Sequence, residues 1–418
     1  MREASPKDIA ASYQDSARVR RRALAYLSFA ELLALSLWFS ATAVLPALAR
    51  EWQLGEAGRA GLTIAVQLGF ILGTLLSALA NLPDIYSPRL LMAASAALGA
   101  AANGALALWV NDLVPALVLR AVTGICMAGV YPPAMKIMAT WFRDGRGTAM
   151  GILIGAVTVG SATPHLIRGA TDLPWRETLL AASLLALLSS AIVLVFVREG
   201  PHRFPAARLD IRMAGAIFRE RGLRLACFGY FGHMWELYAM WTWIGLFLAE
   251  SIQSRGGETY LGVNPSVASF LVIAIGGIGC YIGGLVSDRW GRTTLTMAAM
   301  TLSGLSAAVI GFTFGGPPGL TLAVAILWGV TIIADSAQFS TAVTELSRPA
   351  YVGTALTIQT CVGFALTMLS IWLVPFLVAR VGWGWAFAAL AVGPFLGVAA
   401  MGRLRSLPES LKLAGGRR

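Results

Sequence analysis

Charged side chains are scarce in this sequence. Only 13% of its 418 residues are Asp, Glu, Lys or Arg, whereas 57% are hydrophobic. A soluble protein of this length could form two or three domains, but it would not bury so much apolar surface. The apolar residues instead form blocks of about 20 or more, which is the length that crosses a hydrocarbon core. The composition therefore predicts a polytopic membrane protein.

Cysteines and histidines are also few, and their placement argues against a metal site or a catalytic site. Each of the four cysteines stands alone in an apolar block, which favours packing over metal binding. Only His165 and His233 lie in apolar blocks, and neither has a second ligand at metal spacing. The chain has no Walker-type phosphate loop, and no gap between blocks could house a soluble catalytic domain. We therefore expect no metal, no cofactor and no enzymatic activity.

The formal charge of +11 is unevenly distributed. A basic balance can indicate nucleic acid binding, but the arginines here lie between apolar blocks, mostly in alternate gaps. The richest segments are "RVRRR", "REGPHRFPAARLDIRMAGAIFRERGLR" and "GRLRS". This alternation is the positive-inside pattern, which predicts that both termini are cytoplasmic. We expect a multi-pass protein of the cell's inner (plasma) membrane, in contact with the lipid bilayer and without a nucleic acid partner.

Twelve apolar blocks are long enough to span a membrane. The predicted spans are 24–48, 57–80, 90–110, 113–141, 147–170, 176–197, 224–249, 264–286, 293–314, 319–345, 350–378 and 384–402. They predict an all-α fold with six-helix bundles at 24–197 and 224–403. Residues 1–23 and 404–418 would be cytoplasmic tails, and 198–223 a cytoplasmic basic linker. The first block lacks a convincing cleavage site, so we interpret it as a retained helix.

The two sets of six spans repeat one another. "ELLALSLW" at 31–38 matches "ELYAMWTW" at 236–243, which lies 205 positions later. Most matched positions fall at i, i+3, i+4 and i+7, which is one stripe of an α-helix. "RGTAMGILIG" from Arg146 matches "VGTALTIQTC" from Val352 at an offset of 206. Parallel repeats of this kind indicate two bundles around a central cavity.

Four ionisable side chains fall at membrane depth, where each costs on the order of 2.5–3.5 kcal/mol. They are Glu31, Arg120, Glu236 and Asp335, in the first, fourth, seventh and tenth spans. Burial opposes the ionisation of a carboxyl group, so the acids are candidates to carry a proton or to meet a cationic part of a substrate. His233 could relay a proton. The alternatives are a structural ion pair, an inter-helix hydrogen bond and, for His233, a hydrogen-bonded spectator.

The seventh span is rich in aromatic residues. Such a helix can line a pocket that holds a substrate by ring contacts, although aromatics in spans also serve as packing or interface anchors. The candidate cavity-lining residues are Trp38, Tyr238, Met240, Trp243 and Gln359.

The segment "GGLVSDRWGR" at 283–292, between the eighth and ninth spans, resembles the loop motif of the major facilitator superfamily. Arg120 followed by Gly124 resembles the fourth-helix motif of the same family. The resemblance extends over essentially the whole chain, and it implies a twelve-helix, two-bundle transporter with alternating access. It also implies that Asp288 and Arg292 latch the cytoplasmic side, and that Arg120 supports substrate or proton coupling.

Some segments depart from the family pattern. The gating-loop residues carried over from the resemblance are Asp84, Arg89, Asp288, Arg289, Gly291 and Arg292. The first-half copy, "ANLPDIYSPRLL", has Ser87-Pro88 and one extra residue where the family has a glycine. The fifth span has the glycine spacing of the exporter motif but Ala156 in place of its proline. Branches of the family that carry nitrate or organic phosphates usually have arginines in helices one and seven, or two and eight. These helices carry no arginine at depth here, so the resemblance argues against a strongly anionic inorganic substrate.

The sequence thus predicts a secondary active transporter of a small organic solute, coupled to protons by symport or antiport. We expect it to act as a monomer. An exporter of drugs or toxic compounds with the same fold is the nearest alternative. A non-transporting membrane sensor and a membrane-embedded enzyme are the more distant ones. Fold resemblance alone does not separate these functions.

Overall fold

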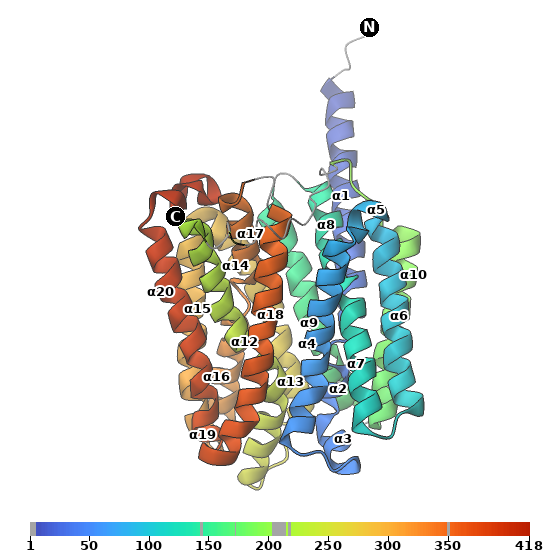
Figure 1. Ribbon diagram of the computed structural model, residues 1–418, viewed down its shortest axis with the longest axis vertical. Helices are drawn as coiled ribbons and strands as arrows, with labels where there is room; N and C mark the ends of the chain where they lie inside the picture. Colours follow the sequence, from blue (N-terminus) through green and yellow to red (C-terminus); the bar gives the residue numbers. More distant parts are fainter. Residues whose placement is uncertain (1–5, 143–144, 172, 203–214, 216–218, 349–351) are drawn as a thin grey trace.

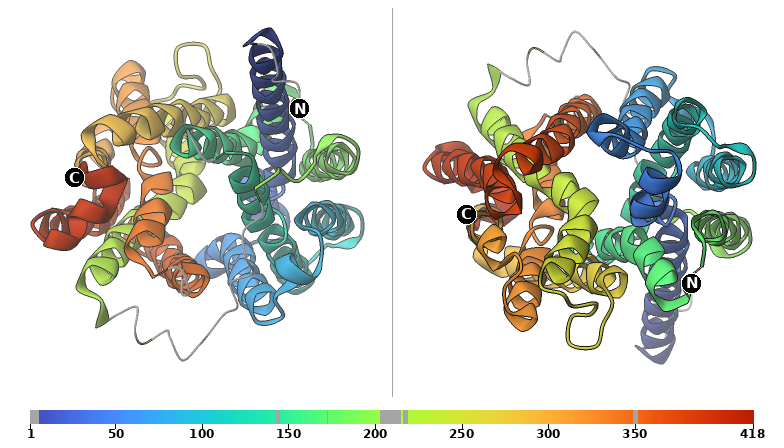
Figure 2. Two further views of the ribbon diagram at one scale, coloured as in Figure 1. Left: turned by 90° about the horizontal axis from the view of Figure 1, so that it is seen from above. Right: turned by 90° about the horizontal axis from the view of Figure 1, so that it is seen from below.

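The structure is a computed structural model. It describes residues 6–142, 145–171, 173–202, 215, 219–348 and 352–418, except for the side chains of 6–16, 83, 84 and 146. Nearly all of these residues are helical, and a single antiparallel bridge joins Tyr260 to Val263. The helices form two groups, blue to green and yellow-green to red, which face each other across the molecule (Figure 2). Most of the predicted linker lies outside the described residues.

Six spans make up the N-terminal bundle, and two of them are interrupted. The first span consists of α1 (Pro6–Leu35), α2 (Ser40–Ala43) and α3 (Leu45–Glu51). The fourth consists of α7 (Leu113–Ala128) and α8 (Tyr131–Trp141). The others are α4 (Glu56–Leu79), α6 (Pro88–Trp109), α9 (Arg146–Thr171) and α10 (Trp175–Phe196). A short helix, α5 (Leu82–Ile85), follows α4.

The C-terminal bundle has the same order of spans. Its continuous spans are α12 (Arg221–Ser254) and α18 (Val352–Val381), and α15 (Arg292–Ile310) is extended by η2 (Gly311–Thr313). The eighth span consists of α13 (Pro265–Ala274) and α14 (Gly276–Trp290), and the tenth of α16 (Pro318–Thr331) and α17 (Ser336–Leu346). The last consists of α19 (Trp383–Ala386), η4 (Phe387–Ala391) and α20 (Val392–Arg405), after which η5 (Pro408–Gly416) follows.

These helices confirm the predicted all-α membrane fold. Among the described residues, ten helices are long and apolar enough to cross a membrane. The two remaining spans are the first, which is interrupted at residues 36–39, and α12, whose apolar length contains His233 and Glu236.

Two interruptions fall at equivalent places in the two bundles. In the fourth span, α8 begins with Tyr131-Pro132-Pro133, where a proline in the first turn has no amide proton to lose. In the tenth span, residues 332–335 separate α16 from α17, and Asp335 precedes the first residue of α17. The breaks end helices near the centre of the molecule, which leaves backbone groups there to be paired by side chains.

The bundles contact each other along two pairs of helices. On one side, α9 packs against α13 and α14, and on the other α4 packs against α18. Glycines allow the first pair to approach closely, since a Cβ on Gly155 would lie 3.0 Å from the carbonyl oxygen of Gly277. The two bundles are therefore in direct contact on both sides of the central space.

The chain crosses repeatedly between two ends of the molecule. The terminal face is the end at which α10, α14 and α20 finish, and the start of α1 and all of η5 also lie at this end (Figure 1). The opposite face is the end at which α3, α9 and α12 finish. The segment η5 folds back on the C-terminal bundle, where Leu413 is fully buried and the amide of Ala414 donates to Glu345 (3.1 Å).

Candidate functional site

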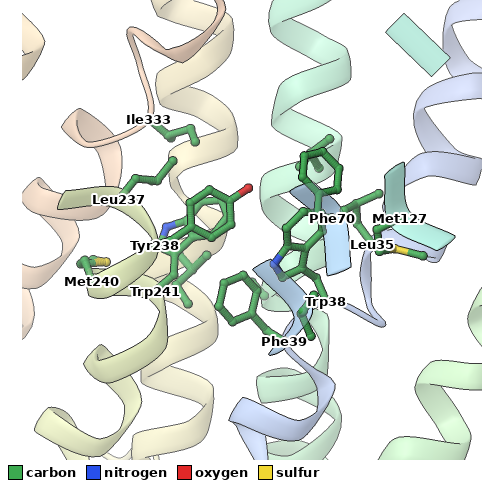
Figure 3. Packing of buried hydrophobic residues seen from close by; sticks show 14 of the residues in the cluster. Leu35, Trp38, Phe39, Phe70, Met127, Leu237, Tyr238, Met240, Trp241 and Ile333 are labelled. Carbon is green, nitrogen blue, oxygen red and sulfur yellow. The ribbon is translucent and has the colours of Figure 1, made fainter. Parts of the chain in front are cut away.

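Aromatic side chains from both bundles meet at the centre of the molecule. The interface aromatic cluster includes Trp38, Phe39 and Phe70 from the N-terminal bundle and Tyr238 and Trp241 from the C-terminal bundle (Figure 3). Phe364 of α18 completes the cluster, in contact with Trp38, Phe70 and Tyr238. The ring centroids of Phe70 and Phe364 are 4.4 Å apart, and those of Trp38 and Tyr238 are 5.7 Å apart. Phe39 meets Trp241 edge-on at 5.8 Å. The central space is filled by rings in this conformation.

The position of Trp38 depends on the interruption of the first span. The fully buried Arg120 of α7 donates to the carbonyl oxygens of Leu37 (2.9 Å) and Trp38. These carbonyls lie just beyond the end of α1, where they lose their intrahelical partners. Arg120 therefore stabilises a break that neither proline nor glycine produces.

Two side chains complete this polar network. Arg120 also donates to the hydroxyl of Ser40 (3.2 Å) and the amide oxygen of Asn103 (3.3 Å). The amide nitrogen of Asn103 donates to Leu179 O (2.9 Å) and Ser183 Oγ (3.0 Å) on α10. The network joins four spans of the N-terminal bundle, so the break is fixed by tertiary contacts.

Glu31 is fully buried on α1 and has no hydrogen-bond partner. Among the described residues, no group donates to either of its carboxyl oxygens. Tyr131 at the start of α8 is near enough for electrostatic interaction with Glu31. A carboxyl group without partners in an apolar interior is costly as an anion, which makes this site unlike an ordinary structural ion pair.

Glu236 has a different environment in the C-terminal bundle. Its Oε2 accepts a hydrogen bond from Ser303 Oγ (2.9 Å) on α15, and its Oε1 accepts one from Trp328 Nε1 (2.6 Å) on α16. Both oxygens are thus paired with donors of the same bundle. The sequence singled out Glu236 but not its partners Ser303 and Trp328, which stand alone in other spans without any pattern.

His233 and Asp335 form a second polar contact in the same bundle. His233 Nδ1 lies 3.0 Å from Asp335 Oδ1, and both side chains are 1% exposed. His233 also lies against the ring of Phe339, with centroids 5.4 Å apart. The structure therefore brings together three of the predicted site residues, Glu236, His233 and Asp335, around α12 and the tenth span.

The predicted cavity-lining residues separate into two groups. Trp38 and Tyr238 belong to the interface aromatic cluster. Met240 points away from the N-terminal bundle (Figure 3), and Trp243 donates its indole N–H to Ile371 O (3.0 Å) of α18. The amide nitrogen of Gln359, on α18, is buried without a partner among the described residues. Phe39, Phe70, Trp241 and Phe364 join the cluster although the sequence pattern did not select them.

The loop motif contains a buried cation paired within the C-terminal bundle. Arg292 donates to both carboxyl oxygens of Glu345 (2.8 and 2.6 Å) and to Gln338 Oε1 (2.7 Å) on α17. This is a bidentate arginine–carboxylate pair, the geometry that favours arginine over lysine. Arg292 therefore ties the start of α15 to α17.

The other motif residues lie at the terminal face of the interface. A Cβ on Gly147 of α9 would lie 3.0 Å from Asp288 Oδ2, so this carboxylate faces the N-terminal bundle. Gly291 has φ of 92°, which favours glycine, and Arg289 is exposed. In the first-half copy, Arg89 Nη1 lies 3.5 Å from Val197 O, whereas the side chain of Asp84 lies outside the described residues.

A hydrogen bond joins the bundles near the opposite face. Asn264, just before α13, donates its amide nitrogen to Gly169 O (2.7 Å) of α9. A Cβ on Gly245 would lie 3.3 Å from the ring of His165, so α12 and α9 also approach closely here. The two bundles are therefore in contact at both ends of the central aromatic cluster.

Comparison with known proteins assigns the chain to a family. A sequence model of the Major Facilitator Superfamily matches residues 27–366. Two solved structures have the same fold: the nucleoside transporter NupG (TM-score 0.69, 14% identity, 91% of this chain and 99% of that one) and the proton:xylose symporter XylE (TM-score 0.70, 15% identity, 93% and 96%).

Curated relatives match part of the chain. The MFS-type transporter pytF of Aspergillus terreus is 25% identical over 177 residues, which are 40% of this chain and 55% of the relative. The Fujikurins efflux protein of Gibberella fujikuroi is 28% identical over 194 residues, which are 44% of this chain and 40% of the relative. The matches thus span about half, or less, of the relatives' lengths.

Proposed function

The chain belongs to the major facilitator superfamily, and we propose that it is a proton-coupled secondary transporter that moves a small organic solute by alternating access. Family and fold point to a transporter and not to an enzyme. We further propose that the terminal face is cytoplasmic in the cell's inner membrane, because the arginine-rich segments gather there. The protein would act as a monomer.

The observation that supports proton coupling is the unpartnered carboxyl group of Glu31. A fully buried carboxyl group without donors is stable in this closed conformation only if it carries a proton. When the bundles separate and water reaches Glu31, the same group can ionise. Opening and closing then take up and release one proton, which is the coupling that a proton-driven transporter requires.

Glu236 has a supporting role in this proposal. Two donors hold its oxygens in place, and these bonds lie inside one bundle, so separation of the bundles leaves them unchanged. The contact between His233 and Asp335 also lies within that bundle. We propose that these three residues keep the C-terminal bundle rigid, while Glu31 responds to the change of access.

Alternating access requires contacts that break at one end while those at the other end hold. At the terminal face, Asp288 faces Gly147 across the interface, and near the opposite face Asn264 donates to Gly169. Each of these contacts involves only a few atoms. Breaking one of them therefore costs little free energy, as is required if the two access states are to have similar free energies. We propose them as the two gates.

The direction of transport is part of the test. One relative is named an efflux protein, and one structural neighbour is a proton:xylose symporter. Import by symport and export by antiport differ only in whether the proton moves with the solute or against it. Both need the same titrating carboxyl group.

The experiment uses the purified full chain in liposomes with an imposed pH gradient. A thermal-shift screen of metabolites and toxic compounds at two pH values selects the solute, and its transport is then measured with and without the gradient. Glu31→Gln should reduce gradient-driven transport about a hundredfold and leave solute exchange intact. Glu56→Gln, the same change on the exposed start of α4, is the control.

An infrared measurement tests the proton without a solute. At neutral pH, the high-frequency part of the carboxylic acid band, which belongs to a protonated carboxyl group without hydrogen bonds, should disappear in Glu31→Gln and persist in Glu236→Gln. Normal gradient-driven transport by Glu31→Gln, or an unchanged carboxylic acid band, contradicts the proposal.

A further inference from the structure

The interface aromatic cluster has the features of a binding site for one chemical class of solute. We propose that it binds a planar aromatic molecule that carries hydrogen-bond acceptors, such as ring carbonyl oxygens, between Trp38 on one bundle and Tyr238 on the other. This inference rests on the proposed transport function and specifies its substrate.

The first observation concerns the tryptophan N–H groups. Among the described residues, six tryptophans donate the indole N–H to a carbonyl or carboxylate oxygen: Trp141, Trp175, Trp235, Trp243, Trp328 and Trp383. The indole nitrogens of Trp38 and Trp241 are buried and have no partner among these residues. Trp52, near the opposite face, is the third such case. Both cluster tryptophans therefore lack a partner that most buried indoles in this protein have.

The second observation concerns two buried amide side chains, of which Gln67 lies beside the cluster. Gln67 lies one turn from Phe70 on the inward stripe of α4, is fully buried, and has no partner for its nitrogen or its oxygen. Gln359, on α18 with Phe364, is 2% exposed and has an unpartnered nitrogen. Buried polar groups in native proteins are almost always paired, so these atoms are available to a partner from outside the chain.

The chemistry of these atoms defines the complementary solute. The unpartnered groups at the cluster include three N–H donor groups, on Trp38, Trp241 and Gln67, against one amide oxygen. A solute that satisfies them must supply acceptors, and carbonyl or ring oxygens do so. No charged side chain belongs to the cluster, which disfavours a strongly ionic solute.

The arrangement of the rings favours a flat, aromatic solute. Trp38 stands between Phe70, Tyr238 and Phe364, with centroid distances of 5.0 to 5.7 Å. The Tyr238 hydroxyl points toward the N-terminal bundle (Figure 3). When the bundles separate, these ring-to-ring contacts open, and a planar solute can replace them with the same offset or edge-on contacts. A water molecule can accept from the N–H groups, but it cannot replace the ring-to-ring contacts.

The test compares compounds that differ in one feature. The probes are coumarin and chromone, which are aromatic and carry acceptor oxygens; naphthalene, which is aromatic without acceptors; and octahydrocoumarin, which keeps the acceptors but is not aromatic. Binding to the detergent-purified full chain is measured by calorimetry. We expect coumarin or chromone to bind at least tenfold more tightly than naphthalene and octahydrocoumarin.

The variants test the assigned donors. Trp38→Phe keeps a ring and removes the N–H, so it should weaken binding of coumarin about tenfold and leave naphthalene unchanged. Gln67→Leu should have a similar effect. Trp372→Phe, on the exposed face of α18, is the matched control and should bind like the wild type. Equal loss for coumarin and naphthalene would show a structural defect and would contradict the donor assignment.

The outcomes separate this inference from the proposed function. If xylose or uridine is moved by a pH gradient while the aromatic probes neither bind nor compete, the transport function stands and the aromatic site is wrong. If the probes bind as expected but no solute responds to a pH gradient, the site stands and the coupling is wrong. Equal affinity for coumarin and octahydrocoumarin overturns the inference.

Discussion

The first and seventh spans share one sequence pattern but have different structures. Glu31 and Trp38 correspond to Glu236 and Trp243 at an offset of 205. In the seventh span, α12 is continuous and both repeated side chains are hydrogen-bonded inside the C-terminal bundle. In the first span the helix is interrupted, Glu31 has no hydrogen-bond partner in the part of the chain that the structure describes, and Trp38 faces the other bundle. A repeated motif therefore supports two different roles.

The difference arises from neighbouring spans and not from the motif itself. Arg120, which holds the break in the first span, corresponds at an offset of 205 to Ala325 (120 + 205). Ser303 and Trp328, which hold Glu236, correspond to Leu98 and Thr123. Each bundle thus has the partners that the other lacks. The N-terminal copy can respond to access, whereas the C-terminal copy is held in place.

The largest effect should follow from removing the side chain that holds the break. Arg120→Leu leaves Trp38 O without its side-chain donor. The single hydroxyl proton of Ser40 can then serve either Leu37 O or Asn103 Oδ1, so one of these acceptors also loses its partner. Each unpaired buried group costs about 1–3 kcal/mol. We expect a loss of roughly 4 kcal/mol in the free energy of unfolding, measured by denaturant titration in detergent. Arg255→Leu, an exposed position after α12, is the control. Wild-type stability in Arg120→Leu would show that the break does not depend on this residue.

The two glutamates should then differ in stability when each is made apolar. Glu236→Leu leaves Trp328 without an acceptor and Ser303 with only Met300 O (3.3 Å), so the free energy of unfolding should fall by about 1–3 kcal/mol. Glu31→Leu removes a group that has no bonds to lose, and it should be neutral or slightly stabilising. Thermal unfolding of both variants under the same conditions measures the difference in their stability. Equal destabilisation would remove the distinction between the two spans.

The smallest effect concerns the equilibrium between closed and open bundles. The closed form holds Glu31 protonated and the open form exposes it to water, so the closed form binds one more proton. Raising the pH should therefore favour opening by about 1.4 kcal/mol per pH unit at most, and lowering it should favour closure. Glu31→Gln should abolish this dependence, while Glu236→Gln should keep it.

Cysteine labelling can measure that equilibrium. Cys280 is buried at the interface, with its Sγ 4.0 Å from Thr158 Oγ1 of α9. In a protein that retains only this cysteine, its labelling rate should rise with pH more steeply than in the same protein with Glu31→Gln. The labelling reaction itself also depends on pH. Because this dependence is the same in the Glu31→Gln protein, that protein serves as the reference. Parallel pH profiles would assign the proton to another group.

Most of the fold could be predicted from the sequence. Ends of the observed helices lie within a few residues of most predicted spans, because long apolar blocks can satisfy their backbone groups in lipid only as helices. The resemblance to the family in "GGLVSDRWGR" and around Arg120 is confirmed by the family match. The exception is α1, which begins at Pro6 and so includes much of the predicted tail.

The site was less predictable, because side-chain direction depends on local helix geometry. Helical spacing placed Met240 and Trp243 on the stripe of Glu236, and they do share it, but that stripe faces the interior of one bundle. Tyr238 and Trp241, on the neighbouring stripe, face the other bundle. The same spacing applied to Glu31 and Trp38 does not hold across the break at residues 36–39. The residue pattern of one helix does not show which neighbouring helix packs against each of its faces.

The sequence by itself determined the class of this protein. Its long apolar blocks follow from what a bilayer excludes, its arginine placement follows the positive-inside rule, and its duplicated pattern indicates two parallel repeats. The tertiary structure decided which of two equivalent glutamates finds donors and which remains alone. Hydrogen bonding depends on distances of about 3 Å between groups far apart in the chain. Such distances are set by how whole helices pack, and a repeated motif does not encode its own surroundings.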